Sequence, residues 1–160
     1  MLMFKLYFVF ILLLRKLLNK IIFVGVIYYD MNEQNLLVKE GTNEEWEIAG
    51  VIDFQDASHG CKIYDIAIYI SYMMMISKDP LETGGHCLKG FMKMRNVSEQ
   101  ELDVLYYCVS ARLVISLLVG LHCYVMVPDK YYLDTQKTGW LVLKNLWKLN
   151  AEDVLKSWLS

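Results

Sequence analysis

The 160-residue sequence lacks an excess of basic charge, any Cys-x-x-Cys pair and any linker rich in proline, glycine or serine. Its net charge of −2 at pH 7 provides no basic field, which argues against nucleic acid as a partner. The four cysteines are scattered, which argues against a zinc site or a disulfide framework and favours reduced thiols in a cytoplasmic protein. Without linkers, repeats or low-complexity tracts, the chain is expected to form one mainly helical domain.

Hydrophobic residues are abundant, at 56% of the sequence against 21% for charged residues. This balance is high for a free-standing soluble protein and is what a lobe without its partner surface would show. Residues 1–14 are apolar apart from Lys5 and are followed by Arg15 and Lys16. The run is shorter than the roughly 20 residues that a helix needs to span a bilayer, and no small-residue cleavage site follows it. We expect an apolar helix of uncertain homology over residues 1–20 and no membrane partner. Two explanations of this segment stay open: a helix buried at the centre of the domain, or a segment unrelated to the rest of the domain.

The most informative pattern consists of Asp30, Asn35 and Asp53. In phosphoryl-transfer loops an Asp accepts the proton of the acceptor hydroxyl and an Asn five residues later binds Mg²⁺. An Asp on the following strand then binds the metal that bridges the nucleotide phosphates. Asp53 follows the apolar residues Val51 and Ile52, and a carboxylate at such a strand end is rarely left without a partner. The pattern therefore predicts Asp30 as catalytic base and Asn35 and Asp53 as metal ligands.

Strand-forming segments flank these three residues. The predicted elements are a buried strand, a second short strand, a polar turn and a returning strand, at residues 21–27, 36–38, 39–45 and 46–54. The first strand leads to Asp30, and the small hairpin made by the others returns Asp53 beside Asn35.

Helical periodicity dominates the rest of the sequence. The predicted helices cover residues 63–74 with an end near 77–80, and residues 86–94, 98–127, 132–148 and 152–159. Ser98 followed by Glu101 predicts a capping box at the start of the long helix. Gly139 predicts an interruption in the helix over residues 132–148.

These motifs resemble the aminoglycoside phosphotransferase family, in which a His-Gly-Asp-x-x-x-x-Asn loop is followed by Asp-Phe-Gly or a variant. The matching runs are residues 30–38, DMNEQNLLV, and residues 50–54, GVIDF, within a wider resemblance over residues 21–158. Members of the family share the protein-kinase-like fold. The resemblance implies an α+β, mainly helical, protein-kinase-like C-terminal lobe over residues 21–160, a truncated phosphotransferase domain whose N-terminal lobe is absent.

The resemblance also implies a reaction, the transfer of phosphate from GTP or ATP, with Mg²⁺, to a small amino-containing alcohol such as 5-hydroxylysine. It gives Asp30 the role of base and Asn35 and Asp53 the role of metal ligands. It implies that Asp65 caps backbone amides of the catalytic loop, while a carboxylate at a helix N-terminus is the ordinary explanation. Tyr28, at the position of the family's His, would support the loop through its hydroxyl. Nucleotide-binding residues of an N-terminal lobe are not identified.

Departures from the family pattern favour a second interpretation. Tyr28 and Tyr29 replace the His and the Gly or Asn before the base, and Gln55 replaces a Gly whose backbone angles Gln resists. Only 29 residues precede Asp30, without a glycine-rich loop, whereas a kinase-like fold needs an N-terminal lobe to cover the phosphates. The alternative function is a catalytically inactive truncated lobe or a pseudokinase-like binding module. Arg112 lies mid-helix among apolar residues, where either an acceptor carboxylate or an internal ion pair would explain it.

Overall fold

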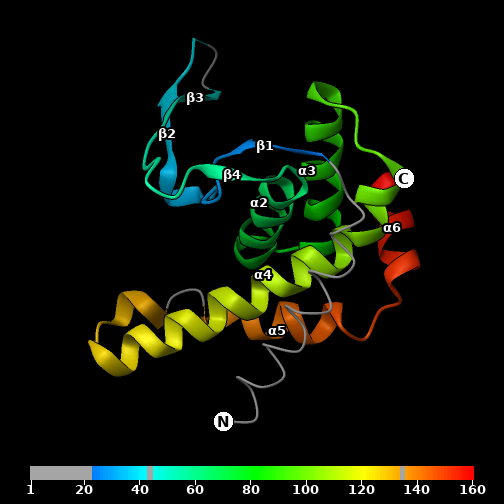
Figure 1. Ribbon diagram of the computed structural model, residues 1–160. Coiled ribbons are helices and arrows are strands. Elements are labelled where there is room, and N and C mark those ends of the chain that lie inside the picture. The colour runs from blue at the N-terminus through cyan, green and yellow to red at the C-terminus, as the bar shows by residue number, and fades with distance from the viewer. Residues whose placement is uncertain (1–22, 43–44, 134–135) are drawn as a thin grey trace.

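The computed structural model describes residues 23–42, 45–133 and 136–160 and is a mainly helical α+β fold (Figure 1). The strands are β1 (Val24–Ile27), β2 (Leu36–Glu40), β3 (Trp46–Val51) and β4 (Ser58–Cys61). The helices are α2 (Ile63–Ile76), α3 (Pro80–Met94), α4 (Glu99–Met126), α5 (Gln136–Leu146) and α6 (Ala151–Leu159), with short 3-10 helices at Glu33–Asn35 and Lys130–Leu133. The helix predicted over residues 1–20 lies outside the described residues.

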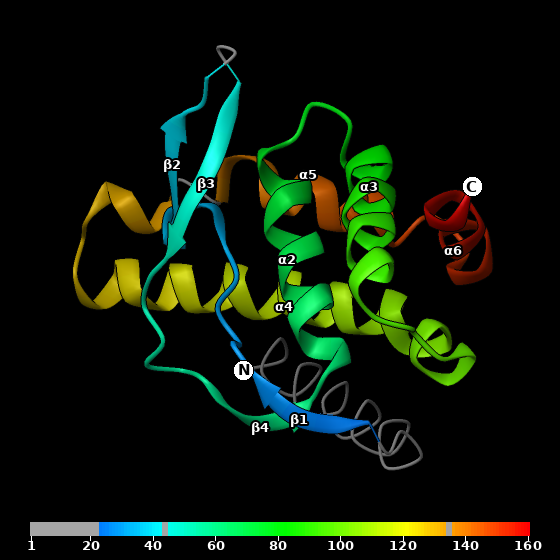
Figure 2. The same ribbon diagram turned by 90° about the horizontal axis from the view of Figure 1, so that it is seen from above.

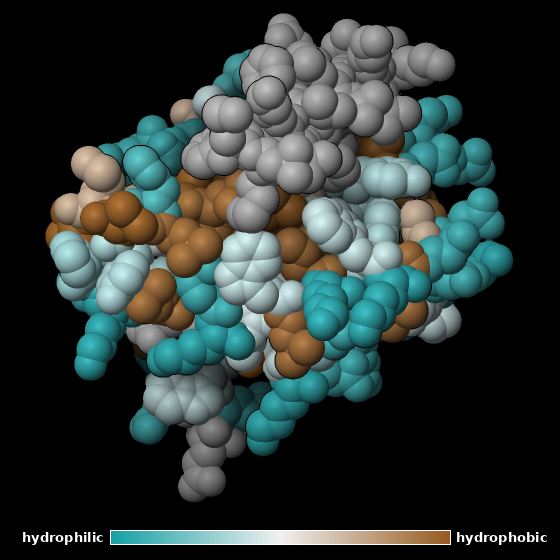
Figure 3. All heavy atoms as spheres, turned by 90° about the horizontal axis from the view of Figure 1, so that it is seen from below, coloured by the Kyte–Doolittle hydropathy of each residue, from teal (hydrophilic) through white to brown (hydrophobic). Residues whose placement is uncertain are grey.

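Helix α4 is the centre of the helical part. Helix α2 crosses α4 and lies side by side with α3, while α5 runs along α4 and α6 packs against α3 (Figures 1 and 2). The core is formed by apolar side chains that these helices bury, including Ile66, Ile70, Met74, Leu88, Leu105, Leu113, Leu117 and Trp158. Several large apolar side chains of α4 and α5 stay exposed, and the face seen from below mixes hydrophobic with polar side chains (Figure 3).

The capping box predicted at the start of α4 is confirmed. The Ser98 side chain accepts from the Glu101 backbone N–H, and the Glu101 carboxylate accepts from the Ser98 backbone N–H. By length and composition, α4 is also apolar enough to cross a membrane, and half of its most apolar window is buried inside the fold. The core helix of a globular domain meets the same description.

The prediction that the second helix begins at residue 86 is wrong, because α3 begins six positions earlier. Asp79 is the N-cap, with its carboxylate accepting from the Glu82 N–H, and Pro80 occupies the first helical position. Proline is favoured there because that position has no intrahelical N–H bond to lose. Asp79 and Pro80, which the sequence placed at the end of the preceding helix, therefore start α3, and α2 ends at Ile76.

The interruption predicted at Gly139 is also wrong. Helix α5 runs without a break from Gln136 to Leu146, and Gly139 is buried inside it. A Cβ at this position would lie 2.6 Å from Leu117 Cδ2 and 3.0 Å from Met75 Sδ. The glycine lets α5 approach α4 and α2 closely, which a sequence-based prediction cannot distinguish from a helix break.

Strand β1 is not the buried strand that the sequence predicted. Its side chains alternate, with Val24 and Val26 50% and 81% exposed while Ile27 is 2% exposed. The reason is that, among the described residues, β1 pairs only with β4, in an antiparallel two-stranded sheet. β4 has the sequence SHGC, which lacks strand-favouring residues, and it was not predicted. Strands β2 and β3 form the predicted hairpin, which projects from the helices (Figure 2).

Candidate functional site

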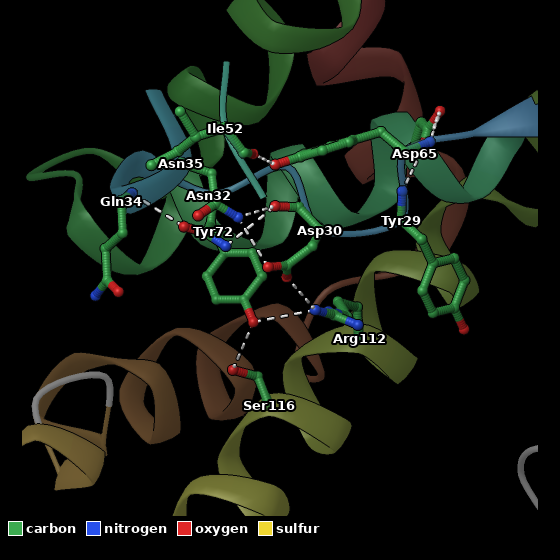
Figure 4. A network of polar contacts seen from close by, with 11 residues as sticks. Tyr29, Asp30, Asn32, Gln34, Asn35, Ile52, Asp65, Tyr72, Arg112 and Ser116 are labelled. Carbon is green, nitrogen blue, oxygen red and sulfur yellow. Dashed lines mark hydrogen bonds and ion pairs between the residues drawn. The ribbon is translucent and has the colours of Figure 1, made fainter. Parts of the chain in front are cut away.

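Asp30 lies in the loop between β1 and β2, and its carboxylate is bound from two sides (Figure 4). The Asn35 side-chain amide donates to Asp30 Oδ2 at 2.8 Å and to the Asp30 backbone carbonyl at 2.9 Å. On α4, Arg112 Nη2 lies 3.3 Å from Asp30 Oδ1. The structure therefore brings the predicted base and the first predicted metal ligand into direct contact, and it adds a guanidinium to them.

Local polar contacts produce the tight turn from Asp30 to Asn35. The Asn32 side chain donates to the Asp30 carbonyl at 3.1 Å and accepts from the Gln34 N–H at 2.9 Å, capping the 3-10 helix Glu33–Asn35. Just before the turn, Tyr29 has a backbone φ of 71°. This is the left-handed region, which residues other than Asn, Asp and Gly rarely adopt. This geometry explains why glycine or asparagine suits that position.

Asp65, in the first turn of α2, holds the backbone that leads into Asp30. Its Oδ2 accepts from the Tyr28 N–H at 3.2 Å and its Oδ1 from the Tyr29 N–H at 2.9 Å. The carboxylate is thus directed to the loop rather than to the N–H groups of its own helix. Charge-assisted hydrogen bonds of this kind are stronger than neutral ones.

Tyr28 connects the loop to the segment that carries Asp53. Its hydroxyl donates to the Ile52 carbonyl, and its ring meets the Phe54 ring edge-on at 4.9 Å. Burial, with the Asp30 and Asp53 carboxylates nearby, raises the pKa of Tyr28 above its ordinary value. The hydroxyl therefore stays protonated and keeps its role as donor.

Asp53 follows β3 and lies next to Asn35. The Ile52 N–H donates to the Asn35 carbonyl at 3.0 Å, which extends the pairing of β2 with β3. Asp53 has a φ of 60°, a conformation that Asp tolerates better than most residues. Within the described ranges, Tyr29 and Asp53 are the non-glycine residues with such angles. Gln55 is not strained in this way, so the expected conflict at the position of the family's glycine does not arise.

Asp30, Asn35 and Asp53 line one cavity of about 490 Å³. Other lining residues come from the loop, α2, α4 and the segment after α4: Glu33, Gln34, Tyr72, Arg112, Ile115, Ser116, Tyr131 and Tyr132. The cavity therefore combines three carboxylates with one guanidinium and several hydroxyl groups.

The donor set fits Mg²⁺, which prefers oxygen ligands and is usually held by one or two carboxylates together with water and substrate phosphates. The Asp53 carboxylate makes no hydrogen bond or ion pair with the residues that the structure describes. The Asn35 amide lies on the same cavity wall. In the described parts of the chain, no group of three or more His, Cys, Asp or Glu side chains is placed to hold a metal. A magnesium ion in this cavity would therefore also need the Asn35 amide, water or substrate phosphates as ligands.

Sequence reasoning missed Tyr72 and Ser116. The Tyr72 hydroxyl lies 3.1 Å from Arg112 Nη2 and 3.5 Å from Ser116 Oγ. The Arg112 guanidinium also lies over the rings of Tyr72 and Tyr29, 5.3 Å and 5.9 Å from their centroids. The only sequence feature that could have pointed to this cluster was Arg112 itself, a charged residue inside an apolar helix. Its internal ion pair with Asp30 is present.

Known proteins share part of this sequence. Residues 10–88 match the sequence model of the phosphotransferase enzyme family. The chain is similar to proteins named hydroxylysine kinase, with 35% identity over 136 residues for that of Xenopus laevis and 35% over 131 residues for that of Danio rerio. Each comparison covers 81% of this chain but only 36% and 37% of those proteins. The chain thus spans little more than a third of the length of these relatives.

Proposed function

The chain belongs to the phosphotransferase enzyme family, and from this premise we propose that it is the catalytic segment of a small-molecule kinase. The proposed reaction transfers the γ-phosphate of GTP, or of ATP, to the hydroxyl of 5-hydroxy-L-lysine or a similar amino alcohol. The acceptor is suggested by the relatives named hydroxylysine kinase. We further propose that the described helices and sheets form a kinase-like C-terminal lobe.

One observation carries the proposal. The Asp30 carboxylate, 25% exposed, is fixed between Asn35 and Arg112 at the wall of the cavity that Asp53 shares. In the proposed step, Asp30 accepts the proton of the acceptor hydroxyl as that oxygen forms a bond to the γ-phosphorus and the bond to the β-phosphate oxygen breaks. Orientation of the hydroxyl by a fixed carboxylate accounts for much of such catalysis.

The other site residues have supporting roles in this proposal. Asn35 and Asp53 would hold Mg²⁺, which neutralises charge on the nucleotide phosphates when bound. Asp65 and Tyr28 keep the loop in place through the Tyr28 and Tyr29 N–H groups and the Ile52 carbonyl.

A non-catalytic binding module is the second candidate. The observation in its favour is the guanidinium of Arg112 on the carboxylate of Asp30. With Arg112 on Oδ1 and Asn35 on Oδ2, both oxygens of the carboxylate already accept hydrogen bonds within the protein. In this case the cavity would bind its small molecule without transferring phosphate.

A transfer assay separates the two candidates. The purified chain is incubated with Mg²⁺, 5-hydroxy-L-lysine and GTP or ATP labelled at the γ-phosphate, beside the variants Asp30→Asn and Asp56→Asn. Asp56 is an exposed carboxylate near Asp53 that does not line the cavity, so it is a matched control. Loss of at least about 100-fold in rate in Asp30→Asn alone supports the kinase, since a general base contributes about 10² to 10⁴. A rate largely retained in Asp30→Asn rejects the role of Asp30, and no transfer by the unmodified chain favours the binding module.

A further inference from the structure

Arg112 is only partly used by the contacts within the protein. Its side chain is 16% exposed, and both of its hydrogen bonds, to Asp30 Oδ1 and to the Tyr72 hydroxyl, come from one atom, Nη2. A guanidinium has five N–H groups arranged to bind a carboxylate through two parallel bonds. Among the described residues, neither the buried Nε nor Nη1 has a hydrogen-bond partner. The ion pair with Asp30 is therefore a single contact that leaves donors of Arg112 unused.

The orientation of this guanidinium is fixed. It lies over the rings of Tyr29 and Tyr72, which come from the catalytic loop and from α2. Such cation–π contacts hold the planar group at little cost to its hydrogen bonding. The cavity thus contains a pre-oriented cation next to Asp30.

A second observation concerns Glu33 on the wall of the same cavity. Its Oε2 is buried and has no hydrogen-bond partner in the described parts of the structure. A buried carboxylate oxygen without a partner is costly, so a cationic group is expected to approach it. Arg112 and Glu33 both line the cavity, and each keeps a polar atom without a hydrogen-bond partner in the described structure; such a pair of opposite charges suits a zwitterion.

We propose that Arg112 binds the carboxylate of the acceptor, so that the acceptor is a hydroxylated amino acid in its zwitterionic form and not a simple amino alcohol. Glu33 gives an ammonium group of the same molecule a partner. The inference rests on the proposed function, which places the acceptor hydroxyl at Asp30. Arg112 is then a specificity-determining residue for that acceptor.

Calorimetric titration without nucleotide tests the inference on the whole chain. The two ligands are 5-hydroxy-L-lysine and its decarboxylated analogue, which keeps both amines and the hydroxyl. The unmodified chain is expected to bind the amino acid about 10 to 100 times more tightly, the effect of a charged hydrogen bond of roughly 1.5–3 kcal/mol. Equal affinities for the two ligands, or no binding of 5-hydroxy-L-lysine, would overturn the inference without any variant.

Variants then locate the effect. Arg112→Met is expected to lose this 10- to 100-fold preference while its affinity for the analogue changes less than about twofold. Lys89→Met, at an exposed position on α3, is the control for loss of a positive charge and is expected to leave both affinities unchanged. Equal weakening of both ligands by Arg112→Met would mean that Arg112 only positions Asp30, which would also overturn the inference.

The titration and the transfer assay test different proposals, so one proposal can be rejected while the other is kept. Carboxylate-dependent binding without phosphate transfer would reject the kinase and keep the Arg112 site. Transfer to both acceptors with equal efficiency would keep the kinase and reject the Arg112 site.

Discussion

The Asp65 carboxylate accepts a hydrogen bond from the backbone N–H of Tyr29 at 2.9 Å, across 36 positions of sequence. A second bond, to the Tyr28 N–H, makes α2 the support on which the loop before Asp30 rests. The position of the proposed base thus depends on a residue that lies outside its own loop.

Replacement of Asp65 by Ala should loosen this loop. Two N–H groups would lose a charged acceptor, and the free energy of unfolding is expected to fall by about 1.5–3 kcal/mol. Hydrogen exchange followed by mass spectrometry should show faster exchange over residues 28–35. Asp103→Ala, at an exposed position on α4, is the control and should change the stability by less than about 0.5 kcal/mol. Unchanged exchange over the loop in Asp65→Ala would show that α2 does not support it.

Two glycines of α3 should respond oppositely to alanine. A Cβ at Gly84 would lie 2.6 Å from Nε1 of Trp158, whose side chain is fully buried and has no room to move, so Gly84→Ala should cost about 1–3 kcal/mol. Gly90 has no atom within 4 Å of such a Cβ, and Gly90→Ala should stabilise the helix by about 0.5–1 kcal/mol. Urea denaturation measures both. A destabilised Gly90→Ala, or a neutral Gly84→Ala, would contradict this account of α3.

The start of α4 should behave as one coupled unit. Glu101 is 1% exposed and binds the Ser98 N–H at 3.0 Å, the Ser98 hydroxyl at 3.2 Å and the Arg95 guanidinium. Ser98→Ala should cost about 1 kcal/mol. Glu101→Ala should cost more, about 2–3 kcal/mol, a figure reduced because the Arg95 side chain is 22% exposed to water.

The double variant of Ser98 and Glu101 distinguishes coupling from two independent effects. Because the two side chains bind each other, its cost should be smaller than the sum of the single costs by about 0.5 kcal/mol or more. Strict additivity in chemical denaturation would contradict the capping box as a cooperative unit.

Cys108 should make stability depend on alkaline pH. Burial, with a smaller contribution from nearby Cys61, raises the pKa of the Cys108 thiol from 9.0 to about 12. The unfolded chain therefore loses this proton first as the pH rises. The contribution is absent below about pH 8 and reduces the free energy of unfolding progressively from about pH 9 to about pH 12, by up to about 1.4 kcal/mol per pH unit.

The measurement is a comparison of the unmodified chain with Cys108→Ala by urea denaturation between about pH 8 and pH 10.5. The two curves should differ by a constant amount at first and then converge, because the alanine variant lacks this titration. Other groups titrate in both proteins and cancel in the difference. Curves that remain parallel throughout would contradict the assignment to Cys108.

Local signals account for what sequence reasoning predicted correctly. The capping box at Ser98, the long helix after it and the hairpin of β2 and β3 all depend on residues within a few positions of one another. The failures share the opposite property. β4 forms only because it meets β1, and Gly139 is required only because Leu117 and Met75 lie against it.

The sequence by itself determined the candidate chemistry, because the spacing of Asp30, Asn35 and Asp53 is a local property of a turn and a hairpin. Only the tertiary structure determined which side chains surround these three residues. Arg112 reaches Asp30 from 82 positions away and Tyr72 reaches Arg112 from 40. In the sequence, Arg112 stands out only as a charge among apolar helical residues, and Tyr72 is an ordinary helical residue. Their meeting follows from how α2 packs on α4, and packing between distant helices depends on the whole core rather than on any one segment.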